Sequence, residues 1–137
     1  IFNKKILQRK QFSQILFINM LNKIKLNNKE ILLFHAASSG ELEQLIPILK
    51  NVNQGEYFIL LTISSPSTVD HIPHNLINAF CYQAFDLPWE VYLFFRNLKP
   101  SKYIITRHDI WPGHILFASM FKSKIFYINA NIHLKSI

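Results

Sequence analysis

A short junction in the chain gathers residue types that often do chemistry. The stretch HAASSGE, residues 35–41, follows the apolar run ILLF and precedes an amphipathic pattern with helical spacing. It supplies an imidazole, two neighbouring hydroxyls, a glycine and a carboxylate. Three roles fit these residue types at this spacing, and the residues alone leave all three open.

The first role is structural, since Ser38 as N-cap and Glu41 after it have the spacing of a capping box. The second is anion binding, since small residues at a helix N-terminus favour phosphate, although the Glu41 carboxylate would repel a phosphate placed there. The third is general-base catalysis, in which Glu41 faces a cleft and Gly40 leaves room for a substrate. The helix N-terminus would favour its negative charge. A well-placed base accelerates a reaction by ~100- to 10,000-fold.

Polar residues after later apolar runs are weaker candidates. Ser65 and Thr68 could bond a sugar or simply form a turn. Asp86 suits either a helix cap or a site at a strand end. Trp111, in a Trp-Pro pair, suits either packing or stacking on a ligand.

Metal and thiol chemistry have little support. His71 and His74 have the spacing of a metal pair, but a proline between them interrupts a regular helix. No further ligand follows at suitable spacing, so no metal site is expected. The single cysteine, Cys81, lies in an apolar run, which predicts a buried and inert thiol and excludes an internal disulfide.

The elements that position these residues follow from an alternating pattern. Short apolar runs alternate with amphipathic stretches of helical spacing, which predicts an α/β fold with a Rossmann-like parallel sheet and helices on both faces. We expect strands at 31–36, 57–63, 78–85, 102–106 and 124–130. We expect helices at 4–24, 40–52, 86–100 and 111–122, a weak helix or loop at 67–76, and Gly55 as the left-handed cap after the second helix.

Ligands of such sheets bind beyond the carboxyl ends of the strands. Nearly every unusual polar residue falls there, in the stretches His35–Gly40, Thr62–Thr68, Phe85–Asp86, Thr106–Asp109 and Asn129–Asn131. No GxGxxG or P-loop pattern is present, so nucleotide binding through a glycine-rich loop is not expected.

The positive charge is concentrated at the start of the chain. The formal net charge is +7, and residues 1–29 hold seven basic residues and no acidic one. We therefore expect a basic amphipathic helical segment at 1–29 and a Rossmann-like domain at 30–137. The helix could lie on an anionic membrane surface or pack its apolar side on the domain. Nucleic acid is not an expected partner, since no aromatic-basic platform appears. The first residue, Ile1, suggests an internal or processed piece.

Five stretches in order resemble the 3-deoxy-D-manno-octulosonic acid (Kdo) transferases of lipopolysaccharide assembly. They are HAASSGE (35–41), TISSPST (62–68), AFDLPWEVYLFFRNLKP (84–100), RHDIWPG (107–113) and INANIHLKS (128–136). The resemblance implies the N-terminal, acceptor-side half of a two-domain GT-B glycosyltransferase. It also implies an inner-membrane location at the cytoplasmic face, a lipid A precursor as acceptor, and CMP-Kdo as a donor bound mainly by the other half. No cofactor or metal is implied.

The resemblance also implies site residues. Glu41 would be the catalytic base, and Arg107 and Asp109 would lie in the transition-state or acceptor region. The family has a glutamate where this chain has Arg107, and an asparagine where it has Gly113. We expect the substrate-binding residues to be His35, Ser38, Ser39, Gly40, Ser65, Thr68, Trp111 and Asn129.

Two other interpretations stay open. One is a noncatalytic Rossmann-like remnant that docks on a membrane or a partner, and the other is a GT-B transferase with a different acceptor. The piece alone is not expected to transfer sugar, because the donor half of the cleft is absent from it.

Overall fold

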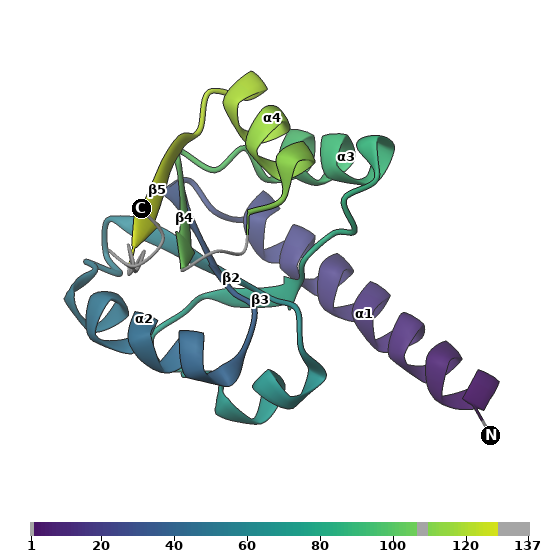
Figure 1. The fold of residues 1–137 in the computed structure, drawn as a ribbon. Helices are drawn as coiled ribbons and strands as arrows, with labels where there is room; N and C mark the ends of the chain where they lie inside the picture. Colours follow the sequence, from purple (N-terminus) through teal and green to yellow (C-terminus); the bar gives the residue numbers. More distant parts are fainter. Residues whose placement is uncertain (1, 107–109, 129–137) are drawn as a thin grey trace, which may run out of the picture.

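Five parallel strands form one sheet with the order β3-β2-β1-β4-β5 (Figure 1). The structure is a computed structural model that describes residues 2–106 and 110–128, apart from the side chains of residues 2, 3, 5, 6 and 9. The strands are β1 Glu30–Ala36, β2 Tyr57–Ile63, β3 Ala79–Tyr82, β4 Lys102–Thr106 and β5 Lys124–Ile128. The expected α/β, Rossmann-like fold is confirmed.

Helices alternate with the strands as the apolar periodicity predicts. They are α1 Phe2–Lys25, α2 Ser39–Asn51, the 3-10 helix η1 Pro66–His71, α3 Pro88–Leu98 and α4 Pro112–Met120. Proline occupies the first turn of η1, α3 and α4. Its lack of an N–H costs no helical hydrogen bond there, because the first N–H groups of a helix have no partner within it. Within the described ranges, no helix is both long and apolar enough to cross a bilayer.

Apolar side chains from alternate strand positions build a core on each face of the sheet. Leu33, Leu60 and Tyr103 face α1, α3 and α4, whereas Leu32, Phe34 and Ile59 face α2 and η1. Cys81 lies in the first of these cores, and burial raises the pKa of its thiol to about 12. The expected burial of Cys81 is thereby confirmed, and the raised pKa disfavours the reactive thiolate.

Two sequence expectations about local structure are wrong, and one open alternative is decided. Gly55 is not left-handed, because the Asn53 side chain accepts a hydrogen bond from its N–H at 2.9 Å and forms the turn instead. Strand β3 covers Ala79–Tyr82 and not 78–85. Of the two roles left open for Asp86, the helix cap is not observed, because the N-cap of α3 is Leu87 without a side-chain bond.

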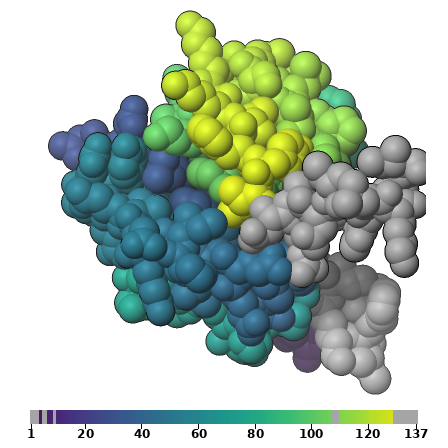
Figure 2. Space-filling model, turned by 60° about the vertical axis from the view of Figure 1, so that its left-hand side comes forward, coloured from purple at the N-terminus to yellow at the C-terminus, as the bar shows by residue number. Residues whose placement is uncertain are grey.

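The β5 edge of the sheet lies at the molecular surface. Figure 2 shows this strand in yellow, beside α4. Phe126 and Tyr127 are 44% and 42% exposed, so both faces of the strand reach solvent among the residues described.

Candidate functional site

The order of the strands reverses between β1 and β4. From β1 the chain proceeds outward to β2 and β3, then crosses back to β4 on the other side of β1. The connections that leave the carboxyl ends of β1 and β4 therefore diverge to opposite faces, which is the usual ligand-binding crevice of an open α/β sheet. Strand β1 ends at Ala36 and strand β4 at Thr106, so the HAASSGE junction lies at this point.

The carboxylate of Glu41 closes the turn between β1 and α2. The Ser38 side chain accepts a hydrogen bond from the Glu41 N–H at 3.3 Å, and Glu41 Oε2 accepts one from the Ala37 N–H at 2.7 Å. The capping interpretation is therefore confirmed, with the difference that Glu41 binds the amide before the N-cap and not that of Ser38 itself.

A second contact ties the same carboxylate to β4. The Thr106 hydroxyl lies 3.1 Å from Glu41 Oε2 and 3.1 Å from the His35 carbonyl oxygen, and its single proton serves one of them at a time. Glu41 is 9% exposed. Among the residues described, these hydrogen bonds all reach Oε2 and none reaches Oε1.

The small residues before Glu41 lie at the surface. Ser38 and Gly40 are exposed, and Ser39 is half-buried. A methyl group added at Gly40 would meet only Ser38 Oγ, at 4.0 Å, and its φ is not positive. Local packing and backbone conformation therefore do not require glycine at this position. Space for a bound ligand is an explanation that remains.

His35 is buried under the sheet edge. It is 0% exposed, and its Nδ1 lies 2.9 Å from Thr62 Oγ1. When the Thr62 hydroxyl donates to the Phe34 carbonyl oxygen at 3.3 Å, His35 must donate from Nδ1. The buried imidazole therefore links β1 to β2 beside the junction. Its direct contact with substrate stays a prediction.

The remaining predicted site residues differ in placement. Ser65, the N-cap of η1, has its Oγ 2.8 Å from Ser67 Oγ within that helix, whereas Thr68 is 0% exposed and points inward. Trp111 is 43% exposed at the start of α4. The expectations for Arg107, Asp109 and Asn129 lie outside the described residues.

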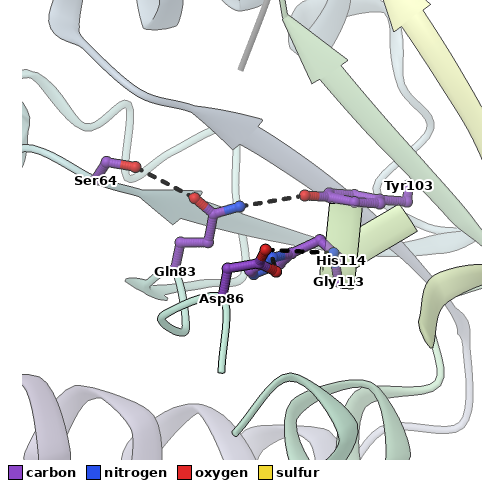
Figure 3. Close-up of polar contacts among 6 residues, drawn as sticks. All are labelled: Ser64, Gln83, Asp86, Tyr103, Gly113 and His114. Carbon is purple, nitrogen blue, oxygen red and sulfur yellow. Dashed lines mark hydrogen bonds and ion pairs between the residues drawn. The ribbon is translucent and has the colours of Figure 1, made fainter. Parts of the chain in front are cut away.

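A polar cluster that the sequence interpretation did not assemble lies at the same edge of the sheet (Figure 3). Gln83 accepts a hydrogen bond from Ser64 at 3.3 Å and donates one to the Tyr103 hydroxyl at 3.4 Å. Asp86 Oδ1 lies 3.2 Å from His114 Nδ1. The sequence pointed to this pair only through the position of Asp86 after a strand. His114 lies on a helix 28 positions further along the chain, so no local pattern connects the two.

Burial dominates the ionisation of His114. The side chain is 1% exposed, and desolvation lowers its pKa from the ordinary 6.5, while the hydrogen bond and charge of Asp86 act in the opposite direction. The neutral ring must carry its proton on Nδ1 to donate to the Asp86 carboxylate. His114 is therefore a neutral donor near pH 7.

Comparison with known proteins gives one consistent result. The family model described as 3-Deoxy-D-manno-octulosonic-acid transferase (kdotransferase) matches residues 7–137. A probable mitochondrial 3-deoxy-D-manno-octulosonic acid transferase of Arabidopsis thaliana is 30% identical over 107 residues, which cover 75% of this chain and 24% of the relative. A 3-deoxy-D-manno-octulosonic acid transferase of Aquifex aeolicus (strain VF5) is 33% identical over 96 residues, 69% of this chain and 27% of the relative. The chain thus spans about a quarter of the length of these relatives.

Proposed function

Because the chain belongs to the Kdo transferase family, we propose that the full-length protein transfers Kdo from CMP-Kdo to a lipid A precursor in lipopolysaccharide assembly. In this proposal the described residues form the acceptor side of the site, and the donor is bound mainly by residues outside it. The observation that carries the proposal is the Glu41 carboxylate at the reversal of strand order, held by Thr106 and by the Ala37 N–H.

Glu41 acts as the general base in this proposal. Its Oε1 takes the proton of an acceptor hydroxyl while the oxygen forms a bond to the anomeric carbon of Kdo. The bond between that carbon and the CMP phosphate oxygen breaks, and its electron pair leaves with CMP. Attack from the side opposite to the leaving group inverts the anomeric carbon. Fixing the base in this way contributes through orientation as well as proton transfer.

The exposed turn before Glu41 is the proposed acceptor subsite. Ser38 and Ser39 offer hydroxyls, and the absence of a side chain at Gly40 lets a sugar approach the backbone. Ser65 and Asn129 are proposed to complete the acceptor side, with Thr68 and His35 contributing from buried positions behind it. Arg107, Asp109 and Trp111 are proposed to serve the same site from the segment between β4 and α4.

Helix α1 is proposed to hold the protein on the cytoplasmic face of the inner membrane. Its Leu16, Phe17 and Met20 pack on the sheet, yet Ile15 and Ile18 are 56% and 55% exposed. The helix therefore presents apolar side chains away from the domain as well as toward it. Exposed lysines such as Lys4 and Lys10 lie on the same helix and would favour anionic lipid.

The test is a transfer assay with the full-length protein. It is incubated with CMP-Kdo and a lipid A precursor, and the product is identified by its mass. The proposal predicts a Kdo-modified lipid and release of CMP. Absence of transfer to this acceptor and to other lipid-linked sugars would instead favour a noncatalytic role, and transfer to another acceptor would favour a different specificity.

A further inference from the structure

The carboxylate of Asp86 binds a helix other than its own. Asp86 lies between β3 and α3, yet both of its oxygens address the start of α4 (Figure 3). Oδ2 accepts a hydrogen bond from the Gly113 N–H at 3.4 Å, and Oδ1 lies 3.2 Å from His114 Nδ1. Asp86 therefore contacts residues that follow it by 27 and 28 positions in the sequence, Gly113 and His114.

Helix α4 lacks a cap of its own. Its N-cap is Trp111, which makes no side-chain cap bond, and its first turn contains no acidic residue. A helix N-terminus carries partial positive charge and unpaired N–H groups, so a carboxylate there stabilises it. Asp86 supplies that carboxylate from outside the helix.

Gly113 makes the approach possible. A Cβ built at this position would overlap the Asp86 carboxylate, and the glycine does not adopt a positive φ. A larger residue at this position would therefore displace the Asp86 carboxylate, whereas the backbone conformation itself does not favour glycine.

His114 is an unusual choice for a merely structural contact. Its Nε2 is buried and makes no hydrogen bond of normal geometry among the described residues, although a backbone hydrogen bond with Ala84 raises the pKa of the ring. A buried polar atom without a well-formed hydrogen bond destabilises a protein, so stability alone does not favour a histidine here. The ring does supply a rigid donor to Asp86 from inside the core.

We propose that Asp86 is a positioning residue, which through Gly113 and His114 fixes the start of α4 and with it the Ile110–Trp111 turn at the transfer site. The inference rests on the proposed function only in treating this turn as part of the site. The chain leaves β4 at Thr106 and enters α4 at Pro112, and a carboxylate binds next to each end: Glu41 at Thr106 and Asp86 at Gly113.

The first measurement does not depend on activity. Amide hydrogen exchange is followed by mass spectrometry in the full-length protein and in its Asp86→Asn and Asp86→Ala variants. Exchange in the peptide that begins at Ile110 should rise by about 10-fold in Asp86→Ala and less in Asp86→Asn, which keeps one acceptor oxygen, because the start of α4 opens more often. Peptides of β1 and α2 should not change. Asp70→Asn, at an exposed carboxylate of η1, is the matched control.

The second measurement uses transfer kinetics and a double-variant cycle. Asp86→Ala and Gly113→Ala should each lower kcat by about 10- to 100-fold with KM for CMP-Kdo within about twofold, because the turn is misplaced while the donor half is intact. The double variant should be no worse than either single one, because both changes break the same contact.

Two results would overturn the positioning role. One is unchanged exchange at the start of α4 in Asp86→Ala, and the other is kinetic losses that multiply in the double variant. If the parent protein transfers no Kdo, the proposed function fails, and the exchange measurement still decides whether Asp86 fixes the turn.

Discussion

Thr106 and Glu41 lie 65 positions apart in the sequence, and the threonine hydroxyl is 3.1 Å from the Oε2 of the glutamate. The contact joins the carboxyl end of β4 to the first turn of α2 across the point where the strand order reverses. The hydrogen bond therefore ties the proposed base to the last residue of β4, from which the chain continues to the Trp-Pro pair at the start of α4.

Removing the Thr106 hydroxyl should loosen Glu41. In Thr106→Val the carboxylate keeps only the Ala37 N–H, so we expect a loss of about 1–2 kcal/mol in the free energy of unfolding and a lower kcat. Denaturant unfolding and transfer assays check the two effects. Thr106→Ser retains the hydroxyl and should stay near the parent in both; equal losses in the two variants would mean that the methyl group, and not the hydrogen bond, matters.

Filling the space at Gly40 should separate stability from function. Gly40→Ala meets only Ser38 Oγ at 4.0 Å, so we expect the fold to be unchanged or stabilised by up to about 1 kcal/mol. The added methyl group should nevertheless raise KM for the acceptor. Thermal unfolding and acceptor titrations provide the measurements. An unchanged KM for the acceptor in Gly40→Ala would contradict the placement of the acceptor subsite at this turn.

The buried histidine predicts a particular pH dependence of stability. Burial lowers the pKa of His114 below its ordinary 6.5, so the unfolded chain takes up the proton first as pH falls. Its contribution is fully present above about pH 6.5 and is lost toward lower pH, down to the native pKa, with a slope of at most about 1.4 kcal/mol per pH unit. The facing titratable groups are Asp86, which opposes the shift, and His35, which adds to it.

The measurement is the free energy of unfolding against pH for the parent and for His114→Asn. The difference between the two curves should shrink as pH falls below 6.5, because the variant lacks the group that titrates. A constant difference across that interval would show that His114 keeps its ordinary pKa in the native protein.

The outward side of α1 should control membrane binding. An Ile15→Ser/Ile18→Ser variant removes exposed apolar side chains without touching the sheet, so stability should change little while binding to anionic vesicles falls by at least about 10-fold. Met20→Ala is the contrasting variant, because Met20 is 1% exposed and its truncation should destabilise the fold by about 2–5 kcal/mol. Vesicle sedimentation with unchanged binding of the double variant would contradict the role of α1.

Local patterns in the sequence predicted most of the architecture. Strand β2 and strand β4 begin and end where their apolar runs do, and Ser38 caps α2 as its spacing indicates. These features depend on neighbours in sequence, which composition and periodicity report directly. The placement of Glu41 at the carboxyl edge of the sheet followed from the same reasoning.

Contacts between distant segments could not be predicted in this way. The Asp86 carboxylate had two local explanations, and its actual partners belong to a helix that no spacing rule connects with it. The Thr106 contact with Glu41 likewise depends on strand order. Gly55 misled because a glycine after a helix is a frequent left-handed cap, whereas here the Asn53 side chain forms the turn.

The central claim is that Glu41 removes the proton from the acceptor, and substitution of this carboxylate tests it most directly. Glu41→Gln and Glu43→Gln are compared in the full-length protein, because Glu43 lies on the same helix with its side chain exposed. The proposal predicts that kcat for Kdo transfer falls by at least about 100-fold in Glu41→Gln, with the fold retained, and is unchanged in Glu43→Gln. Equal kcat in the two variants would contradict it.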